Sequence, residues 1–181
     1  MKVNKIDAAR RQIDAAIRML FEGEDPVAIH TLAMAGFRIL RDWAAKRPDS
    51  YTQRITQSVI RPGMENKFWG CLQSFANFLK HADKDADATS GDVDEEINDA
   101  VLFIACLYYQ DLVKQLTPEM MALFAWYTAI HPEFISEDAT GAFRHAFATA
   151  GSSLRDKPRH DQLAAGKQAL QLARIFLKPK Q

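Results

Sequence analysis

The stretch Ala100-Val-Leu-Phe-Ile-Ala-Cys-Leu-Tyr-Tyr109 is the longest apolar run in the chain. Its ten residues are too few to cross a bilayer, because a helical span needs about 20. The run is apolar on nearly every side of a helix, and such a helix is buried by its neighbours. Flanking residues extend the predicted helix from Asp92 to about Leu116, with Asp92 and Glu95 in the spacing of a capping box. We therefore expect this helix at the centre of an all-α fold.

Elsewhere in the chain, apolar residues recur every three or four positions, which is the rhythm of helices with one buried face. No segment shows the alternation of a strand. The other predicted helices lie at about residues 5–22, 26–44, 51–60, 64–81, 118–130, 136–154 and 159–177. The sequence thus predicts one all-α domain over residues 1–181, a bundle of seven or eight helices.

The charge of the chain is balanced, with 23 Lys and Arg residues against 23 Asp and Glu. A protein that holds nucleic acid normally carries a basic excess. A protein drawn to a membrane surface by charge carries a polybasic segment. The balance therefore argues against both roles.

The two cysteines, Cys71 and Cys106, each lie within an apolar helical pattern and form no CxxC pair. This favours buried free thiols in a reducing compartment. The first 16 residues also lack the apolar core of a secretory signal. We therefore expect a cytoplasmic protein.

A strip of small and polar residues ends the helix predicted over 64–81. Asn77 and His81 are four residues apart, so their side chains are neighbours on the face opposite the phenylalanines. Such a strip can pack against a second helix with its polar tips hydrogen-bonded, which is the simpler interpretation. It can also face a cleft, where Asn77, Lys80 and His81, with His30, would bind a small ligand. In that case the protein is a binding or regulatory module, and we expect it to self-associate.

The acidic loop that follows suggests a divalent cation. Asp83, Asp85 and Asp87 occupy alternate positions, and the loop resembles an EF-hand calcium loop in this layout. It lacks the glycine and the final glutamate of that loop, so the resemblance is confined to these residues. His81 with Asp83 or Asp85 is a different cation site, because imidazole and carboxylate suit transition metals, and would make the protein a metal-dependent hydrolase. A solvated acidic loop without a metal explains the same residues.

Arg155 and His160 give a second enzyme hypothesis. An arginine followed after four to six residues by a histidine resembles the pattern of the HEPN family of helical ribonucleases. The resemblance implies that these two residues are the catalytic pair. A histidine can move a proton from a ribose hydroxyl while an arginine steadies the phosphate. About one such match is expected by chance in a chain of this composition, and Pro158 interrupts the helix between the two residues.

Two longer runs carry a further resemblance. They are Ala76-Asn-Phe-Leu-Lys-His-Ala-Asp-Lys-Asp85 and Leu20-Phe-Glu-Gly-Glu-Asp-Pro-Val-Ala-Ile-His-Thr-Leu32, which resemble segments of a group of uncharacterised bacterial helical proteins. No activity comes with this resemblance. It implies that one recurring arrangement includes Asp25, Pro26, His30, Asn77, Lys80 and His81.

Overall fold

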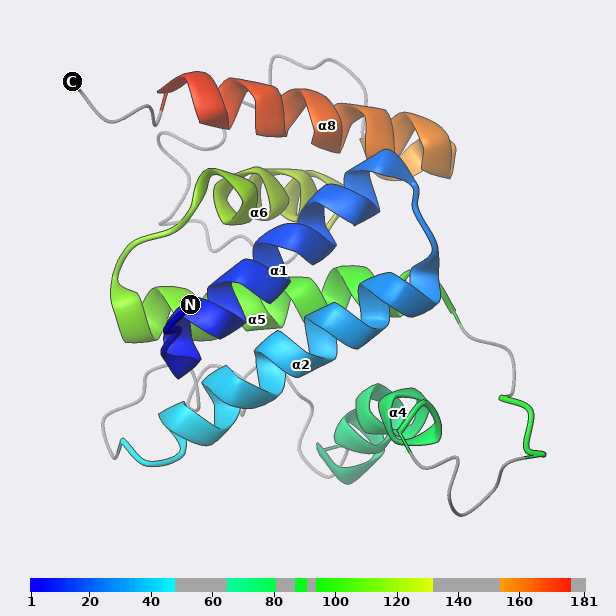
Figure 1. Cartoon of the computed structure of the whole chain (residues 1–181). Coiled ribbons are helices and arrows are strands. Elements are labelled where there is room, and N and C mark those ends of the chain that lie inside the picture. The colour runs from blue at the N-terminus through cyan, green and yellow to red at the C-terminus, as the bar shows by residue number, and fades with distance from the viewer. Residues whose placement is uncertain (48–64, 81–86, 91–93, 132–153, 177–181) are drawn as a thin grey trace.

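The computed structural model describes residues 1–47, 65–80, 87–90, 94–131 and 154–176 (Figure 1). Within these ranges the chain forms six α-helices, one 3₁₀ turn and no strand, which confirms the all-α class. The two further helices predicted over 51–60 and 136–154 lie outside these ranges. The elements are α1 (Lys5–Glu22), α2 (Pro26–Ala44), α4 (Glu65–Phe78), α5 (Ile97–Val113), α6 (Pro118–Ile130), η3 (Leu154–Asp156) and α8 (Arg159–Phe176).

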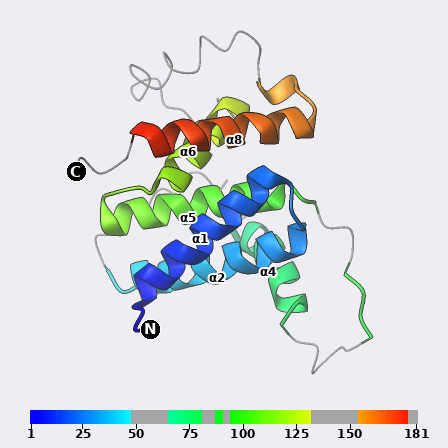
Figure 2. The same cartoon turned by 45° about the horizontal axis from the view of Figure 1, so that its top comes forward.

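The six described helices pack mainly in pairs. The most extensive contacts join α1 to α2, α2 to α5, and α6 to α8. Figure 2 shows α5 between the α1–α2 pair and the α6–α8 pair, while α4 lies to one side, against α2. Buried residues of α5 point toward α1, α2 and α6, so the central position predicted for this helix is confirmed.

The start of α5 differs from the prediction. The helix begins at Ile97, and Glu95 lies in the turn before it. The carboxylate of Asp94 accepts the backbone N–H of Glu96 at 3.0 Å. The predicted capping box with Glu95 is therefore wrong, because Glu95 is outside the helix whose N–H groups it was expected to cap.

The ends of other helices are set by capping residues. Asn4, Asp25 and Thr117 each accept a backbone N–H from the first turn ahead of them, at 2.8 to 3.1 Å. Each such cap stabilises its helix by about 1 kcal/mol. Gly23 ends α1 with a φ of 69°, a left-handed conformation that glycine adopts at little cost.

Two glycines allow the helices to approach closely. A Cβ added at Gly36 of α2 would lie 2.7 Å from Ile13 Cγ1 and 3.1 Å from the Ala9 carbonyl oxygen, both on α1. A Cβ at Gly166 of α8 would overlap the ring of Phe21. The contacts of α1 with α2 and with α8 therefore depend on the absence of a side chain at these positions.

The described part of the chain contains no helix that is long and apolar enough to cross a membrane. Cys106 is a buried free thiol, as predicted, and burial raises its pKa well above the ordinary value. The side chain of Cys71 is not among those described.

Candidate functional site

One polar residue at the end of α4, Asn77, ties this helix to α2. Asn77 is exposed, and its Oδ1 accepts a hydrogen bond from Arg38 Nη2 at 2.9 Å. Lys80 is exposed, and His81 lies outside the described residues. Asn77 thus forms the hydrogen bond between helices that was the simpler interpretation of its position. A cleft shared with His81 stays a prediction.

His30 lies inside the protein, at 0% exposure. Its Nδ1 is 2.8 Å from Asn98 Oδ1, and Asn98 Nδ2 donates to the carbonyl of Pro26 at 3.0 Å. The amide oxygen can only accept, so Nδ1 carries the proton and Nε2 is left as an acceptor. Within the described residues, Nε2 has no hydrogen-bond partner although it is buried. Burial lowers the pKa of His30.

The acidic loop is only partly described. Asp87 is exposed, while His81, Asp83 and Asp85 lie outside the described ranges. Over the part of the chain that is described, no three His, Cys, Asp or Glu residues come close enough to hold a metal ion. The cation sites predicted for this loop therefore stay predictions.

Arg155 and His160 belong to different elements. Arg155 is an exposed residue of η3, and His160 is the second residue of α8. The His160 side chain is 80% exposed, and its Nε2 lies 3.3 Å from Asp161 Oδ1. Pro158 comes before α8 and does not interrupt it. A catalytic role for this pair stays a prediction.

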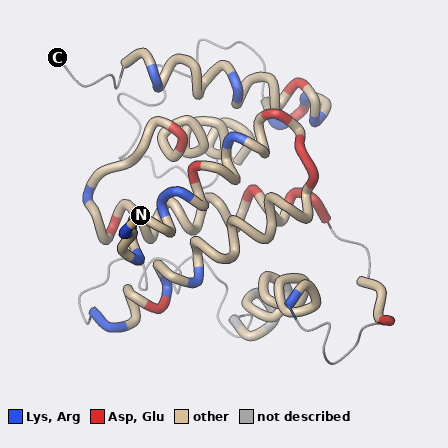
Figure 3. The backbone as a smooth tube through the Cα atoms, viewed as in Figure 1, with Lys and Arg blue, Asp and Glu red and all other residues tan. Residues whose placement is uncertain are grey.

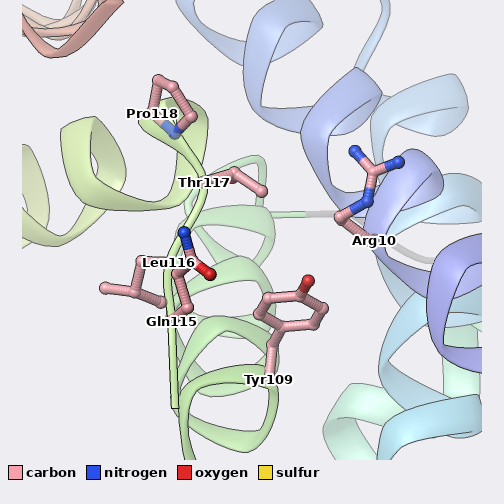
Figure 4. A pocket seen from close by; sticks show the side chains of 6 residues that line it. All are labelled: Arg10, Tyr109, Gln115, Leu116, Thr117 and Pro118. Atoms are coloured by element: carbon pink, nitrogen blue, oxygen red, sulfur yellow. The ribbon is translucent and has the colours of Figure 1, made fainter. Parts of the chain in front are cut away.

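A pocket missed by the sequence reasoning lies where α5 ends and α6 begins, facing α1 (Figure 4). Its volume is about 310 Å³. Small-molecule sites usually measure about 300–1,000 Å³, so this pocket is at the lower end of the range. The residues that line it are Arg10, Tyr109, Gln115, Leu116, Thr117 and Pro118.

Two carboxylates fix Arg10 at this pocket. Its Nε and Nη2 donate to Asp7 Oδ1 at 3.2 and 2.6 Å, and its Nη1 donates to Asp14 Oδ2 at 3.1 Å. A guanidinium has five N–H donors, so two of them are not used by these carboxylates. The contact with Arg10 lowers the pKa of Asp7, and Asp7 in turn raises the pKa of Arg10.

Asp14 joins the two sides of the pocket. It is 5% exposed, and its Oδ1 accepts the hydroxyl of Thr117 at 2.7 Å, while its Oδ2 accepts from Arg10. Burial raises the pKa of Asp14, against the opposing effects of Thr117 and Arg10. The carboxylate therefore positions both neighbours, with each of its oxygens engaged.

Tyr109, Gln115 and the apolar lining complete the site. Figure 4 shows the phenol of Tyr109 and the amide of Gln115 beside a common space, with Arg10 across from them. The Tyr109 hydroxyl has no partner among the described residues, and burial raises its pKa, so it is a neutral donor. Leu116 and Pro118 add apolar surface. The pocket thus combines hydrogen-bond donors with an apolar wall.

Comparison with protein-family models, curated proteins and solved structures finds no match for the chain. Its resemblance to uncharacterised bacterial helical proteins stays a prediction.

Proposed function

We propose that the protein is a binding module that takes a small uncharged molecule in the pocket between α1, α5 and the start of α6. The observation that carries this proposal is the anchoring of Arg10. Asp7 and Asp14 hold its guanidinium in place, so a ligand meets donors that are already oriented. Pre-orientation reduces the entropy lost on binding.

The charges at the pocket favour an uncharged ligand. The single positive charge of Arg10 is already opposed by two carboxylates, so an anion gains little from it. Glu119 also raises the pKa of Asp14, but Arg18 and Arg174 bind the Glu119 carboxylate, so Glu119 adds no net negative charge. A carbonyl oxygen accepts from N–H and O–H donors without bringing a charge of its own.

The apolar wall of the pocket indicates that the ligand also carries an apolar group. Leu116 and Pro118 offer surface to a ring or a short aliphatic group, while Arg10 and Tyr109 offer donors. A primary amide attached to an apolar ring combines the two features. Benzamide is such a molecule, and benzoate has nearly the same shape with a negative charge.

Titration of the intact chain with benzamide and benzoate, followed by amide NMR signals, tests the proposal. We expect benzamide to shift the signals of Gln115, Leu116 and Thr117, and benzoate to bind at least fivefold more weakly. Shifts with benzoate alone would overturn the uncharged class, and no saturable shift with either compound would overturn the site.

The remaining hypotheses rest on the sequence. Self-association and a cytoplasmic location stay predictions. The two enzyme hypotheses also stay predictions: a hydrolase at His81, Asp83 and Asp85, and a ribonuclease at Arg155 and His160. The Arg10 pocket brings oriented donors and a cavity together.

A further inference from the structure

Helix α4 is attached to the other described helices mainly through α2. Trp69 and Phe75 of α4 are half-buried against α2, and Leu72 and Ala76 are buried. We call this contact the α2–α4 joint. Three side-chain pairs form it: His30 with Phe75 at 5.0 Å between ring centroids, Phe37 stacked on Trp69 at 5.8 Å, and Arg38 hydrogen-bonded to Asn77 at 2.9 Å.

His30 is the buried polar residue of the joint. Its Nδ1–H is used by Asn98, which belongs to α5 and is itself fixed by Pro26. Its Nε2 is buried without a partner among the described residues. The neutral ring therefore fits this site, since a lone pair tolerates an apolar setting better than an N–H with a charge does.

We propose that His30 makes the α2–α4 joint sensitive to pH, because protonation at Nε2 places a second N–H and a positive charge where no described group accepts them. Phe75 covers the ring from α4, so the protonated ring regains water most directly when α4 separates from α2. Acid thus loosens α4 while the other described helices keep their packing.

The groups that face His30 leave its charge uncompensated. From α2, the positive charge of Arg38 further disfavours protonation. From α4 the ring faces Phe75, and from α5 it faces the uncharged amide of Asn98. The next residue, Asp99, is engaged by Arg159 through both of its oxygens.

The sign of the pH dependence follows from linkage. Burial lowers the pKa of His30 from its ordinary value of 6.5. His30 has a lower pKa when α4 is packed on α2 (the closed form) than when α4 is detached or the chain is unfolded. At a pH between these two values, the detached or unfolded chain binds more protons than the closed form. The joint is therefore fully stable above pH 6.5 and weakens as the pH falls from there through the lower pKa of the closed form.

Hydrogen exchange of the intact chain at pH values from 7.5 to 5.0, corrected for intrinsic rates, tests the joint. We expect the amides of α4 to lose at least tenfold in protection on acidification, while those of α1 and α8 keep theirs. His30→Gln has no titratable ring and retains a donor for Asn98, so its α4 protection is expected to stay flat. The control His160→Gln removes an exposed imidazole and should behave like the wild type.

Two results would overturn the proposal. One is an equal loss of α4 protection in His30→Gln, which would place the titrating group elsewhere. The other is α4 protection that stays constant while NMR shows the ring of His30 protonated. If His30→Gln does not fold, the NMR titration of the wild type decides alone: a His30 midpoint below 6.5 that coincides with the loss of α4 protection supports the joint, and any other result contradicts it.

Discussion

Two hydrogen bonds, 2.7 and 2.8 Å long, join the guanidinium of Arg159 to both carboxylate oxygens of Asp99. They link the first residue of α8 to the first turn of α5. Asp99 is buried, and the guanidinium also lies over the ring of Trp126 at 5.4 Å. Burial raises the pKa of Asp99, while Arg159 acts against that rise. The pair thus holds the α6–α8 layer on the central helix.

Arg159→Met is expected to lower the free energy of unfolding by about 3–5 kcal/mol, because it leaves a buried carboxylate without its partner. Urea denaturation at pH 7 measures this loss. The control Arg11→Met removes an exposed partner of Asp7 on the surface of α1, where solvent screens the ion pair, and should cost far less. Equal losses in the two variants would show that the Arg159 pair contributes no more than a surface pair.

Gly166→Ala is expected to destabilise the protein by about 1–3 kcal/mol, because the new Cβ would meet the ring of Phe21. Gly70→Ala is the matched control in α4, where an added Cβ has no neighbour within 4 Å. There the better helix propensity of alanine should stabilise the chain by about 0.5–1 kcal/mol. Thermal unfolding compares the two, and a stabilised Gly166→Ala would contradict the close approach of α8 to α1.

Trp126→Phe is expected to cost about 1–3 kcal/mol, because it removes the donor that bonds the buried carbonyl of Gln162 at 2.6 Å. Trp43→Phe alters an indole that is 37% exposed at the end of α2 and should cost less than about 1 kcal/mol. Guanidinium chloride denaturation of both variants measures the difference. A Trp43 variant that loses as much as the Trp126 variant would contradict this account of the hydrogen bond.

The sequence predicted the features that neighbouring residues decide. Asn4, Asp25 and Thr117 cap helices because each acts on N–H groups within three residues of itself. The start of α5 was misplaced, because Asp92 and Glu95 match a capping box in spacing alone. A local pattern cannot distinguish a cap from a turn that precedes the helix.

The pocket could not be predicted in this way. Its donors come from α1 and from the end of α5, and Asp14 meets Thr117 across 103 positions of sequence. Asp14 directly follows Ile13, which belongs to the apolar face of α1. A carboxylate next to this face was the one local indication that α1 makes a buried polar contact. The imidazole chemistry of His30 predicts a ligand residue, but its partner Asn98 is 68 positions away, so the sequence alone does not show that His30 is buried.

The Tyr109→Phe variant bears on the proposed binding function without disturbing the fold. The hydroxyl has no partner among the described residues, so its removal should change the free energy of unfolding by less than about 0.5 kcal/mol. Urea denaturation checks this expectation. A larger loss would mean that the hydroxyl serves the structure rather than a ligand.

The dissociation constant of benzamide, measured by NMR titration of the wild type, Tyr109→Phe and Gln168→Ala, tests the proposed binding site most directly. Loss of one hydrogen bond of about 1 kcal/mol should weaken binding roughly fivefold in Tyr109→Phe. Gln168 is exposed on α8, away from the pocket, and its variant should bind like the wild type. Equal dissociation constants for the wild type and Tyr109→Phe, or shifts confined to residues outside the pocket, would contradict the site.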